Sequence, residues 1–279
     1  MSYWQDRYAE GQAALSRKSE AEIQKQMKKY YSRAAKSVIS EFEATYNHLL
    51  AAIEDGRQPT PADLYKLEKY WQAQGKIRKS LNNLGEIEIE MLTRLFEKSY
   101  IDIYNGLDLP DGGAMFNTLS DDSVKQLINS VWCNDGKAWR ARCWDNKSKL
   151  IEALNDELIN TLLTGKKTSD LKSILQTQFN ASYAEANRLV RTELAHIQTM
   201  AAEQRYKDAG IEEAQVWADK DERQCDICGK LHKTIYRIGE KMPIPAHPNC
   251  RCCIVPVIKT KAVKGLGVKQ QLNIKRVSQ

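Results

Sequence analysis

The sequence of 279 residues predicts a mainly α-helical N-terminal region followed by a small C-terminal α+β module. Apolar residues recur at three- and four-residue steps along the first two thirds of the chain, and segments that alternate like β-strands begin only after Gly210. Five of the seven cysteines fall between residues 225 and 253, inside the module. We therefore divide the chain into a helical region (1–180), the α+β module (181–258) and a basic, flexible tail (259–279).

The first long helix is expected over residues 3–55, which contain almost no Gly or Pro. Pro59 and Pro61 end it, because proline lacks the backbone donor and restrains the residue before it. A second helix is expected from Ala62 to about Asn105, and Gly75 and Gly85 are positions where it would bend or divide. Its apolar side comprises Leu64, Leu67, Trp71, Ile77, Leu81, Leu84, Met91, Leu95 and Ile103.

Shorter helices are predicted next, beginning with one that Ser120 caps and that runs to about Cys133. Further helices are expected at 147–164 and 169–179. Ser182-Tyr183-Ala184-Glu185 has the pattern of a capping box, so Ser182 is expected to start a new helix that Gly210 stops.

An aromatic and basic cluster lies between these helices. One stretch contains Trp132, Trp139 and Trp144 together with Arg140, Arg142, Cys133 and Cys143. We expect these tryptophans to pack in a buried helical corner, and stacking on nucleic acid bases is the alternative.

Three strands are predicted in the module, at 214–219, 233–238 and 253–258. Pro256 places the third at a sheet edge or a strand end, because proline cannot donate to a ladder. Cys253 is expected to be a core residue of this closing strand.

The net charge of +6 comes from the C-terminal end. No acidic residue follows Glu240, whereas residues 1–240 hold 34 basic and 36 acidic side chains. Such an end favours nucleic acid or an acidic partner, and a solvated tail is the alternative. The expected contact residues of the tail are Lys259, Lys261, Lys264, Lys269, Lys275 and Arg276.

Neither secretion nor membrane spanning is expected, because the chain has no apolar run of about 18 residues and no secretory signal pattern. An odd number of cysteines in such a chain argues against a disulfide framework.

The cysteine spacing instead predicts a metal site. Cys225 and Cys228 form a CxxC knuckle, and His247 and Cys250 follow in a second turn, with Cys252 as the rival for the fourth position. Two thiolates from one turn, completed by two N or S ligands from another, suit tetrahedral zinc, so we predict a structural zinc ion that stabilises the module. The alternatives are reduced cysteines that merely pack and, with less support, redox chemistry of the CxxC pair.

Catalytic patterns are weaker. The chain lacks the His-x-Glu element of zinc deaminases and the His-Glu-x-x-His helix of zinc proteases. We therefore expect no enzyme activity. The alternative is a nucleic-acid-processing enzyme or toxin, of nuclease type, that uses Arg191, Glu193 and His196. If the chain is not an enzyme, we expect His196 to be a histidine on the helix surface. The 191–193 segment is then expected to make a salt-bridged contact to the module.

From about Leu171 to Val257 the chain resembles phage Mu protein F-like minor head proteins, also called phage head morphogenesis proteins. The resemblance rests on the order of several motifs: Arg191-Thr192-Glu193-Leu194-Ala195, Tyr206 before Gly210, Trp217, 221–228 (DERQCDIC), Leu231-His232 and 247–252 (HPNCRC). It implies a minor capsid protein of a tailed phage or prophage that acts in procapsid assembly near the portal, and possible roles in DNA packaging or ejection.

The partners that the resemblance implies are the portal protein, capsid or scaffolding proteins and, through the tail, packaged DNA. The implied location is the virion, in the head interior or at the portal vertex, after assembly in the host cytoplasm. The resemblance also favours a fold-holding metal cluster over an active site. The run Cys250-Arg251-Cys252-Cys253 departs from the family pattern, which leaves the choice of the last ligand open.

Overall fold

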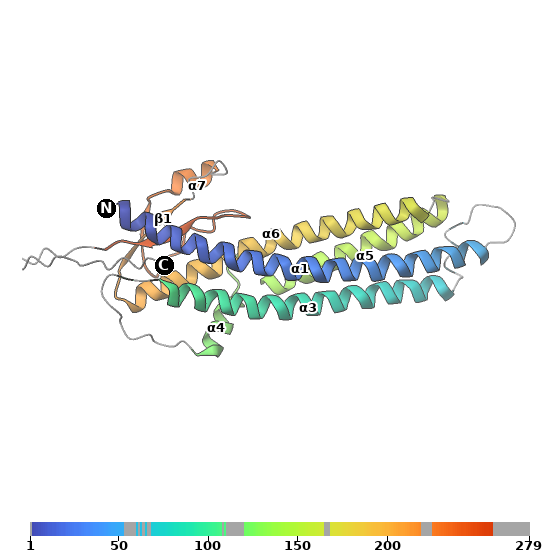
Figure 1. Cartoon of the computed structure of the whole chain (residues 1–279), viewed down its shortest axis with the longest axis horizontal. Helices are drawn as coiled ribbons and strands as arrows, with labels where there is room; N and C mark the ends of the chain where they lie inside the picture. Colours follow the sequence, from blue (N-terminus) through green and yellow to red (C-terminus); the bar gives the residue numbers. More distant parts are fainter. Residues whose placement is uncertain are drawn as a thin grey trace, which may run out of the picture.

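The computed structural model describes residues 2–52, 60, 62, 65, 68–107, 109, 120–164, 168–218 and 225–258. Four long helices lie side by side in an elongated bundle, and a small sheet packs at one end of it (Figure 1). The bundle helices are α1 (Ser2–Ala52), α3 (Glu68–Gly106), α5 (Trp139–Thr164) and α6 (Thr168–Asp208), with the short α4 (Asp121–Ile128) beside α3. The predicted fold class, helical with a small α+β module, is confirmed.

The sheet consists of β1 (Glu213–Trp217), β2 (Ile235–Arg237) and β3 (Cys253–Pro256), with α7 (Asp226–Leu231) between β1 and β2. Its order is β2-β1-β3, and both pairings are antiparallel, with Gln215 opposite Ile235 on one side and Val255 on the other. Pro256 lies on an edge strand, as predicted. Cys253 lies in β3 and packs against the small apolar cluster formed by Ala9, Trp217 and Val255.

Two of the predicted helix starts have different outcomes. Ser120 is the N-cap of α4, since its Oγ accepts a hydrogen bond from the Ser123 backbone at 3.3 Å. Ser182, by contrast, lies inside the continuous helix α6, so the predicted break before it is wrong. Its buried hydroxyl donates to Asn146 Oδ1 at 3.0 Å, and Asn146 Nδ2 donates to its carbonyl. A partner on a neighbouring helix has replaced the local cap.

The tryptophan segment forms a helical corner in which Trp139 is buried, as expected, whereas Trp132 is half-buried and Trp144 is exposed. α5 begins at Trp139, before the predicted start at 147, because the ring of Trp139 is buried against Phe96 and its N–H donates to the Ile128 carbonyl at 3.0 Å. The ring of Trp144 lies on α3 at Gly85, where a Cβ would stand 2.6 Å from it. Gly85 therefore permits close helix packing and does not divide α3.

One predicted core position is wrong at the other end of α3. Trp71 is 53% exposed, and its ring stacks on Tyr65, with 5.8 Å between the ring centroids.

No described helix is long and apolar enough to cross a membrane.

The N-terminal helix packs on the C-terminal sheet. The buried side chain of Gln12 donates to the Ile254 carbonyl at 2.7 Å and to the Tyr206 hydroxyl at 3.2 Å. The Tyr206 hydroxyl in turn donates to the same carbonyl at 3.0 Å. α6 also crosses the predicted boundary between residues 180 and 181 without interruption. Two helices, α1 and α6, therefore connect the bundle to the module.

A charged pair lies inside the bundle. Lys147 Nζ is 2.7 Å from Glu88 Oε2, with side-chain exposures of 1% and 2%, and it also donates to the Tyr31 hydroxyl. Because each buried charge needs the other, the pair fixes how α3 and α5 align against each other more than it adds net stability.

Substituting Lys147→Met should lower the free energy of unfolding by about 3 to 5 kcal/mol, because it leaves the Glu88 carboxylate buried without its cation. Adding Glu88→Met should recover most of that loss. Lys149→Met, in the same helix but 68% exposed, should change it by less than about 0.5 kcal/mol. Urea denaturation measures all three, and equal losses for the Lys147 and Lys149 variants would refute the role of the buried pair.

Candidate metal centre

The first half of the centre is the N-terminus of α7. Cys225 caps this helix, and its Sγ accepts a hydrogen bond from the Cys228 backbone at 3.4 Å. Hydrogen bonds from backbone N–H groups lower the pKa of the Cys225 thiol, with that of Cys228 the largest contribution. The CxxC spacing thus folds locally into a turn that presents two sulfurs on one side.

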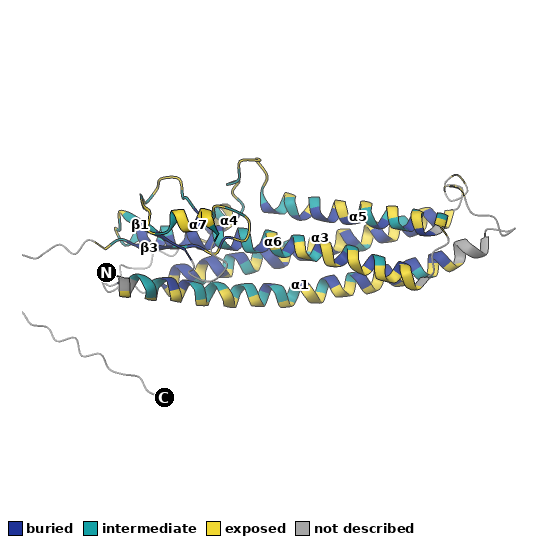
Figure 2. Cartoon of the chain, turned by 90° about the horizontal axis from the view of Figure 1, so that it is seen from above, coloured by how far each residue is buried: buried dark blue, intermediate teal, exposed yellow. Residues whose placement is uncertain are grey.

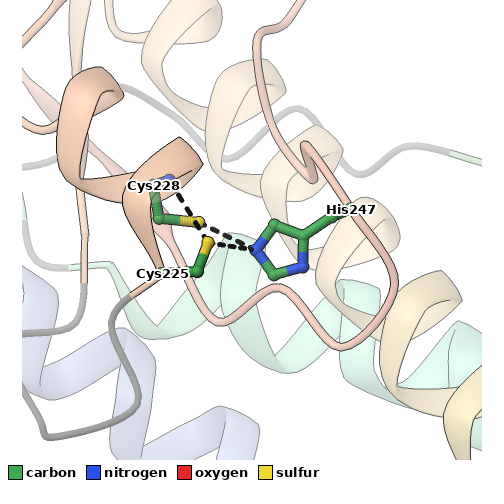
Figure 3. A group of neighbouring side chains, drawn as sticks. All are labelled: Cys225, Cys228 and His247. Atoms are coloured by element: carbon green, nitrogen blue, oxygen red, sulfur yellow. Dashed lines mark hydrogen bonds between the residues drawn. The ribbon is translucent and has the colours of Figure 1, made fainter.

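His247 approaches these sulfurs from the irregular segment 241–250 (Figure 3). Its Nε2 lies 3.2 Å from Cys225 Sγ and 3.0 Å from Cys228 Sγ. Its Nδ1 is 2.8 Å from the Pro248 carbonyl, which can only accept, so Nδ1 carries the proton of the neutral ring. Nε2 then turns its lone pair toward the two cysteines, which is the form that binds a metal.

Cys250 and Cys252 complete the cluster. Cys250 Sγ lies 3.8 Å from Cys228 Sγ, and the sulfurs of Cys228, Cys250 and Cys252 all lie within 4.8 Å of one another. Zinc–sulfur bonds of about 2.3 Å in a tetrahedron place the sulfurs about 3.8 Å apart. The structure thus brings all five predicted ligands together as two triads that share Cys228.

The second turn is held against α6. The Asn249 backbone N–H donates to Thr192 Oγ1 at 3.1 Å, and Asn249 adopts a positive φ of 63°. Arg191, one residue earlier on α6, pairs instead with Glu20 of α1. The expected contact between the 191–193 segment and the module therefore exists, but Thr192 makes it through a hydrogen bond rather than a salt bridge.

A pocket of about 910 Å³ adjoins the centre, between α5, α6 and the 241–248 segment. Glu193 and His196 line it, and both are buried, at 3% and 8% exposure. Trp132 closes over them, because its N–H donates to Glu193 Oε2 at 2.8 Å and its ring stacks on His196 at 4.3 Å. The expectation of a surface histidine is wrong, since the loop before α5 folds back over this face of α6.

Burial shifts the pKa of both groups. Desolvation raises the pKa of the Glu193 carboxyl and lowers that of His196 to about 4, so the imidazole is neutral at neutral pH. Arg191 does not line this pocket but a smaller one, with Glu20. The three residues of the nuclease-type alternative therefore do not share one site. The predicted contact residues of the tail, 259–279, lie outside the described residues.

Residues 152–255 match the family model for phage Mu protein F like proteins. The chain carries a phage Mu protein F like region. This region spans the second half of α5, all of α6, the sheet up to Val255 and all five predicted ligands. It confirms the resemblance inferred from the motif order. The phage Mu protein F like region covers a little over a third of the chain.

The chain is also similar to the NAD(+)--arginine ADP-ribosyltransferase EFV of Enterococcus faecalis (strain ATCC 700802 / V583), with 23% identity over 181 residues. The match covers 58% of this chain and 37% of that protein, so the chain spans little more than a third of its relative's length. No solved structure matches the chain.

The His196 imidazole should titrate with a midpoint near 4 in the folded protein, well below its ordinary value of 6.5. The unfolded chain then takes up the proton first, so His196 makes the free energy of unfolding fall as the pH drops from 6.5 toward 4. Between pH 7 and 4.5 the free energy of unfolding of His196→Gln should therefore fall by roughly 2 to 3 kcal/mol less than that of the wild-type protein. Imidazole NMR titration and urea denaturation at both pH values measure this, and a folded midpoint near 6.5 would contradict it.

Proposed function

We propose that the chain is a non-enzymatic minor head protein of a tailed phage or prophage that acts in procapsid assembly near the portal. The observation that carries the proposal is the phage Mu protein F like region at 152–255, which contains the whole metal-ligand cluster. The proposed location is the virion, in the head interior or at the portal vertex, after assembly in the host cytoplasm.

The helical bundle is the proposed surface for capsid, scaffolding or portal subunits. α1 has 51 residues, which corresponds to about 75 Å of helix. Exposed residues follow the outer side of the bundle helices along their length (Figure 2). A long rigid surface of this kind suits contact with more than one subunit of an assembly. The basic residues of 259–279 are proposed to lie against packaged DNA, since clustered Lys and Arg neutralise phosphates.

For the metal centre we propose one structural zinc ion, held by Cys225, Cys228, His247 and Cys250. The distances of 3.0 to 3.8 Å from Cys228 to His247 and Cys250 suit the edges of a zinc tetrahedron. Cys252 remains the competing ligand. Four protein ligands leave no open position for water, so the ion would hold the second turn on α7 rather than catalyse.

The enzymatic alternative has less support. Arg191 pairs with Glu20 and lies apart from the pocket of Glu193 and His196. The transferase activity in the name of the Enterococcus faecalis protein belongs to that protein, of which the match covers 37%.

Protein purified under reducing conditions without chelator should contain about one zinc per chain by elemental analysis. Cys225→Ser should lose the metal and lower the melting temperature, because metal-binding energy here is folding energy. Cys133→Ser, outside the cluster, should keep both, and comparing Cys250→Ser with Cys252→Ser identifies the fourth ligand. Metal-free wild-type protein with an unchanged melting temperature after added zinc would refute the centre.

The head-protein proposal predicts that the chain co-purifies with procapsids or virions at a fixed ratio to the portal protein. Quantitative mass spectrometry of both particles after phage induction measures that ratio. Because procapsids and virions have not yet ejected their DNA, a protein that leaves with the DNA is still counted. A cytoplasmic host enzyme added to the lysate serves as the control for trapping. Absence from both particles, with the protein abundant in the lysate, would refute the proposal.

A further inference from the structure

The pocket beside the candidate metal centre has a buried carboxyl on its floor, that of Glu193, with no direct cationic partner among the described residues. Glu193 is 3% exposed, and the hydrogen bond that reaches its carboxylate comes from the neutral N–H of Trp132. Among the described residues no Lys, Arg or His nitrogen forms a salt bridge with it. A buried carboxylate without a cation is costly, so this position favours a positively charged ligand group.

A second polar atom on the floor also lacks a partner. His196 Nε2 is buried and has no hydrogen bond within the described part of the chain. His196 follows Glu193 by three residues on α6, so the two side chains occupy one face of the helix. The floor thus offers a carboxylate and a neutral imidazole side by side, beneath the indole of Trp132.

Two other charged side chains that line the pocket, Arg142 and Asp145, each have an ion-pair partner. Arg142 Nη2 lies 2.7 Å from Asp135, and Lys137 Nζ lies 2.6 Å from Asp145. Arg142 lines the pocket and attracts the Glu193 carboxylate through space, but its Nη2 is held by Asp135, so Glu193 has no cation within salt-bridge distance among the described residues.

The mouth has the opposite charge. Lys149 and Arg188 share Glu185, at 3.7 and 4.0 Å, and all three line the pocket with the exposed Lys241. Three cations around one carboxylate give the mouth an excess of positive charge. The wall between mouth and floor includes Pro243, Ile244 and Pro245, which offers apolar contact to an aliphatic stem.

We propose that this pocket binds a peptide segment of a partner protein in which one arginine lies between acidic residues. The guanidinium would donate to Glu193 and His196 and lie against Trp132, the stem would follow the apolar wall, and the acidic flanks would meet Lys149, Arg188 and Lys241. Arginine suits the floor better than lysine, because its planar fork can serve two acceptors and stack on an aromatic ring. A volume of about 910 Å³ holds several residues rather than one side chain. The proposal is independent of the chain's role in head assembly.

The probe is the peptide acetyl-Glu-Ala-Arg-Ala-Glu-amide, titrated by calorimetry into the full-length protein at low salt. Its matched partner carries citrulline in place of arginine, which keeps the shape and removes the charge. We expect the citrulline peptide to bind at least about tenfold more weakly, because it leaves the buried carboxylate without a cation. Glu193→Gln should abolish that difference, whereas Glu152→Gln, on an exposed part of α5 outside the pocket, should preserve it.

The flanks are tested at the mouth. Arg188→Glu should weaken binding of the acidic-flanked peptide and leave acetyl-Ala-Ala-Arg-Ala-Ala-amide unaffected. Circular dichroism and thermal melting confirm that each variant is folded, and the citrulline comparison on wild-type protein requires no variant. Equal affinity for the arginine and citrulline peptides, no binding of the arginine peptide at millimolar concentration, or a preference that persists in Glu193→Gln would each overturn the proposal.

Discussion

The packing of α6 against its neighbours is the constraint on which the sheet end of the molecule depends. Successive residues of this helix face different partners: Arg191 pairs with α1, Thr192 holds the turn at Asn249, and Glu193 faces the pocket. About four turns later, Tyr206 bonds to the closing strand. Because a helix turns about 100° per residue, a short motif can serve three different surfaces. The Arg-Thr-Glu run is thus a junction between three surfaces.

Buried polar contacts give this packing its specificity. Gln12 and Tyr206 both bond to the Ile254 carbonyl, which ties the N-terminal helix to the C-terminal strand across 242 residues. Lys147 and Glu88 do the same between α3 and α5. Apolar helix faces alone could repack after one helix slides by a turn against another. A buried amide or charge would lose its partner in such a shift, which is energetically costly. The bundle and the sheet therefore keep one alignment, and the metal ligands come from segments held in fixed positions.

The features that could be predicted from sequence are those with local causes. The CxxC turn, the strand alternation and the Ser120 cap each depend on a few consecutive residues, and the structure has all of them. The failures have partners distant in sequence. Ser182 has a good capping pattern, but Asn146 on another helix satisfies its hydroxyl. His196 is polar and helical, and only the loop that carries Trp132 makes it buried. The spacing of Glu193 and His196 by three residues was the one local sign that they share a face.

The candidate metal centre and the pocket share a wall, so an ion bound in one and a ligand bound in the other would be coupled. His247 presents Nε2 to the cysteines and also lines the pocket. The segment before it, from Met242 to Ala246, forms the apolar side of that pocket. The hydrogen bond from Asn249 to Thr192 holds the segment near one point, and coordination through His247 would hold it at a second. A ligand that needs this wall in place would then bind more tightly to a metal-loaded chain. By thermodynamic reciprocity the same ligand strengthens metal binding by an equal factor. A fold-holding ion at this position would therefore act on partner recognition through the position of one short segment, with no catalytic step.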